Sequence, residues 1–269
     1  MIDSHCHLDL EAFDVDRDAV IARAVTAGVT GILVPAIRPR TWPALLATAR
    51  RHGLLRVALG IHPQIVPDLA PDEAPDDIDE LANRIARAIA DAGDAVVAVG
   101  ECGLDAATGH LARQEAIFRA HIRAARAVNK PLVIHVLRAH DLAPGVLRDE
   151  RAHEVGGVLH SYSGGEQLVG VYRDLGMSFS FAGPITYPNA RRPVEAARAI
   201  PAELLLAETD APDQAPAAHR GGRSEPAFVA DVIAGLAAAR GVDGAELAAL
   251  TTANATRLFG HFGVDSAAG

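Results

Sequence analysis

The stretch that decides the fold is residues 77–103, DIDELANRIARAIADAGDAVVAVGECG. Its first part has apolar residues at spacings of three and four, the pattern of a helix with one apolar face: Ile78, Leu81, Ile85 and Ile89. Its second part is a short, almost continuous apolar run, which is typical of a parallel strand covered on both faces. The run ends at Glu101, a carboxylate beside a buried segment. A helix followed by a buried strand predicts an α/β fold.

The same alternation runs through the chain. Apolar, strand-like runs occupy residues 1–7, 31–36, 56–63, 95–103, 131–137, 156–164, 177–183 and 204–212. Roughly eight βα units predict a single (β/α)8 TIM barrel, although an open doubly wound sheet gives a similar pattern. Residues 241–260 predict extra C-terminal helices that close the barrel. No Pro/Ser/Gly-rich linker divides the chain, so we expect one domain over residues 1–263 and a flexible tail over 264–269.

The composition excludes several classes of protein. The formal net charge is −9 and the pI is near 5.7, so tight non-specific binding to duplex DNA is not expected. Cys6 and Cys102 are the only cysteines, too few for a disulfide scaffold or a Cys-rich zinc site, and we read both as packing residues. The sequence has no signal-like segment and no apolar run long enough to span a bilayer. We expect a cytoplasmic protein with no membrane association and no obligate protein partner.

Side chains that can bind metal fall at the ends of the predicted strands. His5 and His7 are two residues apart in an extended segment and therefore share one face. The carboxyl ends of barrel strands converge on one face of the fold, where active sites lie. Each residue alone has an ordinary interpretation, a hydrogen-bonded histidine or a turn aspartate. Together they predict a metal site built from His5, His7, Glu101, His135, His160 and Asp210.

The ligand types restrict the metal. Histidine and carboxylate without thiolate suit Zn, Mn, Fe, Co, Ni or Mg. Six ligands are enough for two divalent ions, with Glu101 as the bridge. We expect His5, His7 and Asp210 to complete one shell, and His135 with His160 the other. Asp210 would align a metal-bound hydroxide or act as its general base.

The motifs of the chain resemble, in order, those of the TatD family of metal-dependent deoxyribonucleases, a branch of the amidohydrolase-like barrels. The matching segments extend from residue 1 to about residue 260: DSHCHLD, GIHP, GECGLD, the His135 strand, HSYSGG, ETDAP, GGRSEP and TTANATRLFG. The resemblance implies a TIM-barrel hydrolase with one to three divalent ions, and its ligand positions fall on the six residues named above. It also implies that His62, in GIHP, contacts phosphate.

The chain departs from the family pattern at positions near the substrate. An aromatic residue and an arginine often follow GLD in the family, but Ala106 and Ala107 stand here. After the His135 strand, Leu137 replaces the usual arginine, and Arg138 comes one residue later. The family motif RNEP is Arg-Ser-Glu-Pro at residues 223–226. The metal ligands are therefore retained while the predicted substrate contacts are altered, so hydrolysis is better supported than DNA as the substrate.

Several neighbouring residues have two interpretations. His62 is predicted to act in catalysis and phosphate binding, or to order its loop. Arg223, near a helix start, is predicted to bind an anion, or to pair with Glu225 in a solvated loop. Ser161 and Ser163 are predicted to line the substrate pocket. Asp3 and Glu208 are expected to hydrogen-bond histidine ligands. No function is assigned to the remaining histidines, most of which we expect to be solvated: His52, His110, His121, His140, His153, His219 and His261.

Three functions fit these features. The first is a phosphodiesterase or deoxyribonuclease that acts on single-stranded or frayed DNA ends, or on a small phosphodiester, with Asp210, Glu101 and His62 as catalytic residues. The second is an amide, lactone or ester hydrolase, including an aminoacyl-tRNA deacylase. Many such barrels bridge their metals with a lysine at a strand end, whereas the sole lysine, Lys130, precedes its strand. The third is a barrel whose metal is structural or stored, which the surplus of ligands at an open mouth disfavours.

Overall fold

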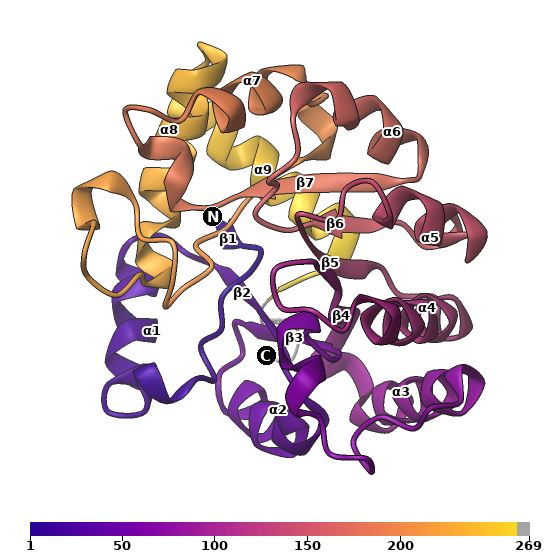
Figure 1. Cartoon of the computed structure of the whole chain (residues 1–269). Coiled ribbons are helices and arrows are strands. Elements are labelled where there is room, and N and C mark those ends of the chain that lie inside the picture. Colours follow the sequence, from indigo (N-terminus) through magenta and orange to yellow (C-terminus); the bar gives the residue numbers. More distant parts are fainter. Residues whose placement is uncertain (263–269) are drawn as a thin grey trace.

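The computed structural model describes residues 1–262, and the predicted tail at 264–269 lies outside them. Within that range eight parallel strands stand in sequence order around a barrel (Figure 1). Their bounds are β1 (Ile2–Asp3), β2 (Gly31–Pro35), β3 (Leu55–Leu59), β4 (Val96–Asp105), β5 (Leu132–Leu137), β6 (Gly157–Leu159), β7 (Met177–Phe181) and β8 (Leu205–Ala207).

The last strand meets the first, which distinguishes a barrel from an open sheet. The Ser4 amide donates to the Ala207 carbonyl at 3.1 Å, and the Asp210 amide donates to the His5 carbonyl at 2.9 Å. Beyond the ends of both strands, Cys6 and Ala211 form a parallel bridge. The predicted TIM barrel is therefore confirmed.

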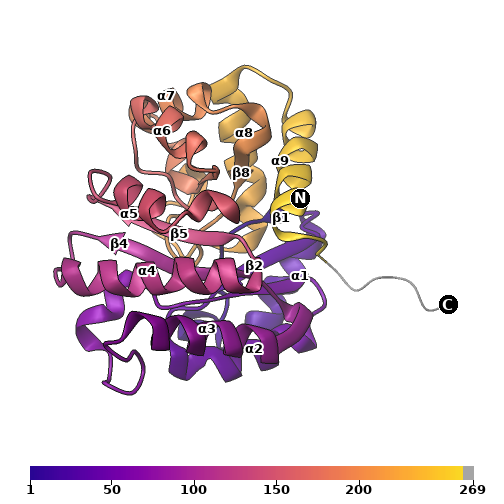
Figure 2. The same ribbon diagram turned by 90° about the vertical axis from the view of Figure 1, so that its right-hand side faces the viewer.

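Helices surround the barrel (Figures 1 and 2). They are α1 (Arg17–Thr26), α2 (Trp42–Arg51), α3 (Ile78–Ala92), α4 (Leu111–Val128), α5 (Ala143–Asp149), α6 (Val169–Asp174), α7 (Arg191–Ala199), α8 (Val229–Arg240) and α9 (Gly244–Phe259). The helix predicted at the opening stretch begins where Asp77 caps it by accepting a hydrogen bond from the Glu80 amide at 2.8 Å. It ends at Gly93, whose positive φ of 69° stops the helix.

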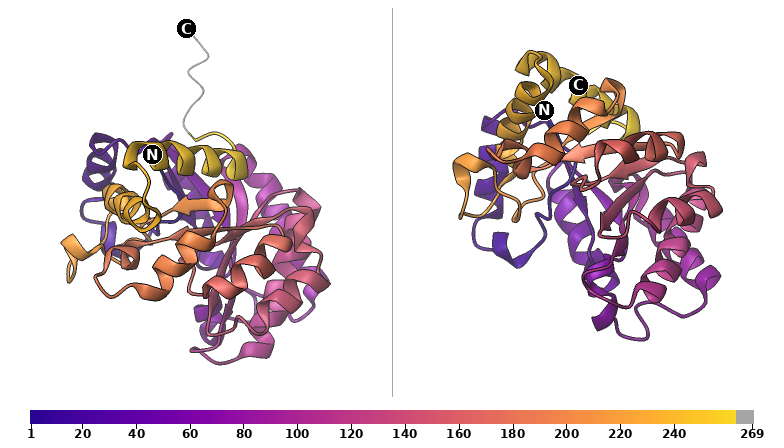
Figure 3. Two further views of the ribbon diagram at one scale, coloured as in Figure 1. Left: turned by 90° about the horizontal axis from the view of Figure 1, so that it is seen from above. Right: turned by 45° about the horizontal axis from the view of Figure 1, so that its top comes forward.

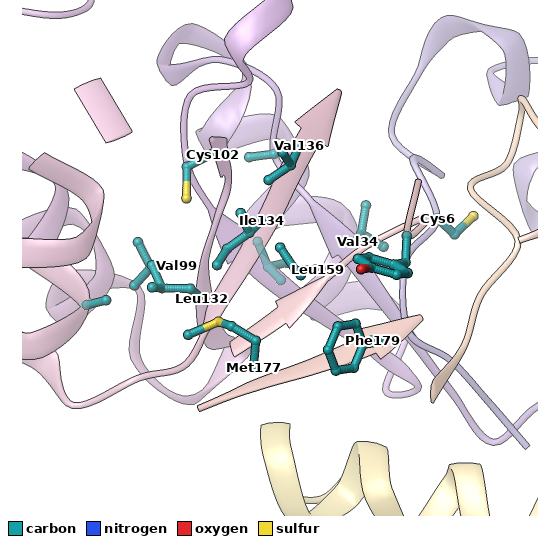
Figure 4. Packing of buried hydrophobic residues seen from close by; sticks show 14 of the residues in the cluster. Cys6, Val34, Val99, Cys102, Leu132, Ile134, Val136, Leu159, Met177 and Phe179 are labelled. Carbon is teal, nitrogen blue, oxygen red and sulfur yellow. The ribbon is translucent and has the colours of Figure 1, made fainter. Parts of the chain in front are cut away.

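The strands are apolar because both of their faces are covered. On β5, Ile134 packs outward against the helix layer and Val133 points into the barrel. Figure 4 shows the outer layer, in which Cys102, Ile134 and Val136 lie close together. Cys6 and Cys102 are both free and fully buried, so their predicted role in packing is confirmed.

The C-terminal helix α9 closes the end of the barrel where the strands begin (Figures 2 and 3). Its Phe259 belongs to a buried cluster with inward side chains from seven strands: Ile2, Leu33, Ala58, Ala98, Val133, Val158 and Leu206. These seven side chains, with Ala255 and Phe259, are called the floor cluster below. No helix in residues 1–262 combines the length and the hydropathy that crossing a membrane requires.

Several strands are shorter than the apolar runs that predict them. The first ends at Asp3 rather than at residue 7, and β6 and β8 have three residues each. The ladder stops there because the chain diverges into the loops above the barrel. The metal-competent residues at 5, 7, 160 and 210 therefore lie just beyond their strands, held by single backbone bonds such as that from the His7 amide to the Ala211 carbonyl at 2.8 Å.

Candidate metal centre

The carboxylate of Glu101 lies at the middle of a group of imidazoles at the open end of the barrel. Its Oε2 atom is 3.1 Å from His5 Nε2 and 3.3 Å from His7 Nε2. Its Oε1 atom is 2.8 Å from His160 Nε2 and 3.1 Å from His135 Nδ1. Glu101 is fully buried. The two carboxylate oxygens thus face two different sets of histidines.

Asp210 completes the pair formed by the N-terminal histidines. Its Oδ1 atom is 3.6 Å from His5 Nε2 and 3.7 Å from His7 Nε2. The two Nε2 atoms are themselves 3.2 Å apart. The structure therefore brings together all six side chains predicted as ligands, in the two subsets predicted from the sequence.

Two glycines allow Glu101 to reach this position. Gly100 and Gly103 have positive φ values of 147° and 138°, a region that L-residues rarely adopt. A Cβ atom on Gly100 would collide with the Val133 carbonyl, and one on Gly103 with the His135 carbonyl. Close approach of the β4 backbone to β5 therefore requires glycine on both sides of Glu101.

The donor set fits a divalent ion. His5, His7 and Asp210 offer three ligand atoms within 4.8 Å of one another. Glu101 Oε2 is buried and has no hydrogen-bond partner among the described residues, although two ring nitrogens face it. Buried polar atoms are rarely left unpaired, and a metal ion is one explanation for such an atom. Nitrogen and oxygen ligands without sulfur suit the borderline and hard divalent metals.

The charge state of Glu101 also suits a metal ligand. Burial alone would raise the pKa of this carboxyl, but electrostatic interaction with the surrounding imidazoles of His62, His160 and His5 holds the pKa well below its usual range. Glu101 is therefore an anion that can offer both oxygens.

Two carboxylates lie beside histidines of the centre. Glu208 Oε1 lies 3.5 Å from His160 Nδ1 and accepts a hydrogen bond from the Ser161 amide at 2.6 Å. Asp105 Oδ2 lies 3.4 Å from His135 Nε2. Glu208 thus lies beside a ligand histidine as expected, but His160 Nδ1 has no hydrogen-bond partner among the described residues. The expectation for Asp3 needs correction, because Asp3 accepts from the backbone amides of His5 and Thr209 rather than from an imidazole.

A cavity of about 650 Å³ opens directly above the centre. Its polar wall comes from β4 and β5 and from the loops that follow β1, β3, β6 and β8, at the end of the barrel where active sites are built. Apolar side chains contribute the rest of the lining: Leu10, Ile37, Ile65, Val136, Leu137, Pro184 and Pro193. The volume is that of a small-molecule site.

Three of the predicted substrate-contacting residues line this cavity. His62 Nε2 is 2.9 Å from Glu101 Oε1, and its Nδ1 accepts from the Gln64 amide at 3.1 Å. Ser161 Oγ donates to Gln214 Oε1 at 2.8 Å, and Ser163 Oγ donates to the Val136 carbonyl at 2.9 Å.

Arg223 does not line the cavity, so the prediction that it binds the substrate there is wrong. Its guanidinium pairs with Asp16 and with Glu225, at 2.8 Å in each case, and lies over the Phe13 ring. Two carboxylates already neutralise it, so Arg223 ties the loop before α8 to the N-terminal segment. The alternative interpretation, a local pair with Glu225, describes its position.

Two histidines expected in solvent have structural roles. His121, on α4, is fully buried and accepts a hydrogen bond from the Ile61 amide at 3.0 Å. His140 is partly buried and lies 2.8 Å from the Tyr172 hydroxyl. The expectation that most unassigned histidines are solvated is wrong for these two. Their burial depends on tertiary packing that their local sequence does not reveal.

Gln214 is a site residue that the sequence reasoning missed. It lines the cavity, and its Nε2 donates a hydrogen bond to Asp210 Oδ2. Gln214, Asp210 and Ser161 all have positive φ, at 50°, 52° and 42°. Such backbone conformations in non-glycine residues cluster at functional sites. The only signal in the sequence is a spacing of four from Asp210.

Comparison with known proteins identifies the family. A model of the family described as TatD related DNase matches residues 2–260. The chain belongs to the TatD family. It is 36% identical to the metal-dependent hydrolase YcfH of Escherichia coli K12 over 264 residues, covering 96% of this chain and 95% of that protein. It is 33% identical to the 3′-5′ ssDNA/RNA exonuclease TatD of Salmonella typhimurium, covering 96% and 98%.

A solved structure agrees with this assignment. The crystal structure of the TatD homologue YjjV from Escherichia coli K12 superposes with a TM-score of 0.88 at 31% identity, covering 97% of this chain and 98% of that one. The TIM-barrel fold, the family and the expectation of a metal-dependent hydrolase are therefore confirmed.

Proposed function

We propose that this chain is a two-metal phosphodiesterase that removes nucleotides from the 3′ end of single-stranded nucleic acid. The observation that carries the proposal is the convergence of four histidines and Asp210 on the buried Glu101 carboxylate beneath an open cavity. A relative that is 33% identical over nearly the whole chain bears the name of a 3′-5′ exonuclease, which supports this substrate class and polarity.

Two sets of residues would hold the ions. His5, His7, Asp210 and Glu101 Oε2 would form one set, and His135, His160 and Glu101 Oε1 the other. Zn, Mn, Fe, Co, Ni and Mg all accept ligands of these kinds. Divalent ions bound there supply Lewis acidity and lower the pKa of a coordinated water.

Asp210 is positioned to receive a proton. Gln214 holds Oδ2, so Oδ1 turns toward His5 and His7. In this role Asp210 aligns the attacking water and takes its proton as a general base.

His62 offers a hydrogen-bond donor to the substrate. Its Nδ1 accepts from the Gln64 amide, so the proton of the neutral ring resides on Nε2. This nitrogen faces Glu101 at the bottom of the substrate cavity. An N–H at this place donates to a phosphate oxygen and stabilises charge that develops during hydrolysis.

The shape and charge of the molecule favour a strand end over a duplex. A cavity of about 650 Å³ is large enough for about one nucleotide. The formal charge of −9 opposes the extended phosphate contacts that duplex binding needs. The amide, lactone or ester alternative has less support, since Lys130 precedes β5 at the far end of the strand from the centre.

The test is hydrolysis of a 5′-labelled single-stranded oligonucleotide by the purified protein with each divalent metal in turn. We expect a ladder of products shortened from the 3′ end, which disappears with EDTA and in Asp210→Asn. Bis(p-nitrophenyl) phosphate serves as a small substrate that reports on the metal centre alone. Hydrolysis of amide or lactone substrates, with both phosphodiesters untouched, would overturn the proposal.

A further inference from the structure

Three side chains beside the metal centre form a hydrogen-bonded chain that the reaction described above does not use. The Tyr172 hydroxyl, on α6, is 2.8 Å from His140 Nδ1. His140 Nε2 is 3.0 Å from Ser163 Oγ. Ser163 Oγ lies 2.9 Å from the Val136 carbonyl and lines the cavity. The chain therefore runs from the buried ring of Tyr172 to the wall of the substrate cavity.

The donor and the acceptor of each hydrogen bond in this series of side chains can be assigned. The Val136 carbonyl can only accept, so Ser163 donates to it. Ser163 Oγ then accepts from His140 Nε2–H, and His140 Nδ1 accepts from the Tyr172 hydroxyl. The reverse direction would leave the buried Tyr172 hydroxyl proton without an acceptor among the described residues, which is costly.

The charge states of the two rings agree with this direction. Burial lowers the pKa of His140 to about 4, so its ring is neutral at pH 7. Burial also raises the pKa of Tyr172 above its usual range, so its hydroxyl stays protonated. A neutral histidine with a donor on Nδ1 carries its proton on Nε2 and presents it to Ser163.

The hydrogen bonds to His140 and Val136 determine whether Ser163 can donate a hydrogen bond to a ligand or accept one from it. A hydroxyl has one proton and two lone pairs. Ser163 gives its proton to Val136 and uses one lone pair for His140, so the remaining lone pair is an acceptor for the cavity. Phosphate oxygens are also acceptors, so they do not pair with this site. The same cavity is also lined by the apolar side chains of Leu137, Pro184 and Pro193, which suit the face of a sugar or a base.

We propose that Ser163 accepts a hydrogen bond from the 3′-terminal sugar hydroxyl of the substrate strand, an inference that rests on the proposed exonuclease function. In DNA the 3′-terminal sugar carries a free hydroxyl, whereas interior sugars do not. A fixed acceptor near the metal centre therefore selects strand ends over the interior of a strand. Tyr172 and His140 are positioning residues, because they act on the ligand only through Ser163.

The experiment compares two 5′-labelled DNA oligonucleotides that differ only in ending with a 3′-hydroxyl or a 3′-deoxy sugar. For the wild-type protein we expect kcat/KM for removal of the first nucleotide to fall about tenfold with the 3′-deoxy end, the effect of one lost hydrogen bond to a held acceptor. Ser163→Ala should cleave both at the same rate. Tyr172→Phe should reduce the discrimination in part, whereas Tyr187→Phe, whose hydroxyl bonds the Ala215 carbonyl instead, should keep it.

The outcomes separate the two proposals. Equal rates on the two oligonucleotides with wild-type protein, or discrimination that persists in Ser163→Ala, would overturn the role of Ser163 while leaving the exonuclease intact. A preference that follows the terminal base instead of the hydroxyl would overturn it as well. Absence of cleavage of any oligonucleotide defeats both proposals, and hydrolysis of bis(p-nitrophenyl) phosphate then shows whether the metal centre works. Metal content is measured for each variant. If Ser163→Ala does not fold, the proposal is tested by the rates of the wild-type protein on the two oligonucleotides and by the discrimination that Tyr172→Phe retains.

Discussion

The two ends of the barrel interior are built from the same strands with opposite chemistry. At the end where the strands begin, the floor cluster is apolar and is sealed by Phe259. At the other end the inward side chains are histidines and carboxylates around Glu101. On β5 the change takes two residues, from Val133 to His135. Residues at i and i+2 of a strand share a face, so both point into the barrel.

This difference separates stability from chemistry. Burial of the floor cluster holds the strands together regardless of what stands above it. The polar end contains buried polar atoms without hydrogen-bond partners. Such atoms lower the free energy of unfolding, which an apolar core would not do. Substitutions at the two ends should therefore have different effects, one on folding and the other on metal binding and catalysis.

The largest expected effect is on catalysis, from Glu101→Gln. Both carboxylate oxygens face imidazole pairs, and an amide cannot serve as an anionic bridge. We expect kcat/KM on bis(p-nitrophenyl) phosphate to fall about 10³-fold or more, with loss of bound metal by elemental analysis and a retained circular dichroism spectrum. Full activity would refute the bridging role.

Phe259→Ala is expected to lower stability and to leave catalysis unchanged. Its ring is 4% exposed in the floor cluster, so truncation should lower the free energy of unfolding by about 3–5 kcal/mol. Activity per folded molecule should not change. Chemical denaturation and active-site titration measure the two quantities. Val15→Ala, at a side chain that is 94% exposed, is the control and should leave stability unchanged. Loss of activity without loss of stability would contradict the separation of the two ends.

A histidine outside the barrel gives a pH test. Burial lowers the pKa of His121 to about 4, below the ordinary value of 6.5 for an unfolded chain. The unfolded state therefore binds the proton more readily between pH 6.5 and 4, and stability falls as pH decreases through this window. The contribution is about 3 kcal/mol when fully lost. Denaturation of wild type and His121→Gln at several pH values should show this extra slope in the wild type only. Parallel curves would mean that His121 is not held neutral.

The smallest effect is expected from Gln214→Leu, which removes the amide that holds Asp210 Oδ2. Loss of such an orienting partner typically costs 10–100-fold in metal affinity or activity. Isothermal titration with Mn²⁺ and steady-state kinetics would measure it, and Gln167→Leu, at an exposed position, is the matched control. Unchanged affinity would show that Asp210 is held by its backbone alone.

The fold and the ligand set could be predicted from the sequence because both depend on local patterns. Apolar runs mark the strands, and parallel topology brings their carboxyl ends to one face, so His135 and Asp210 could be placed together without knowledge of the loops. The closing helix was also predictable, since residues 241–260 continue the apolar pattern beyond the last strand.

The remaining site residues depend on how loops fold back, which no periodicity encodes. Gln214 reaches the cavity, and His140 reaches the cavity residue Ser163, from loops outside the strands and helices. The prediction for Arg223 was wrong because one of its two acidic partners, Asp16, is 207 residues away in the sequence and could not be foreseen, whereas Glu225 is a near neighbour. His121 is buried because α4 packs against the loop after β3, a contact between distant segments.

The most direct test of the account is a crystal of the protein soaked in Mn²⁺ and measured for anomalous scattering. We expect two peaks beside the Glu101 carboxylate, one held by His5, His7 and Asp210 and the other by His135 and His160. Absence of ions at Glu101, or ions bound only away from it, would contradict the claim that this end of the barrel is a two-metal catalytic centre.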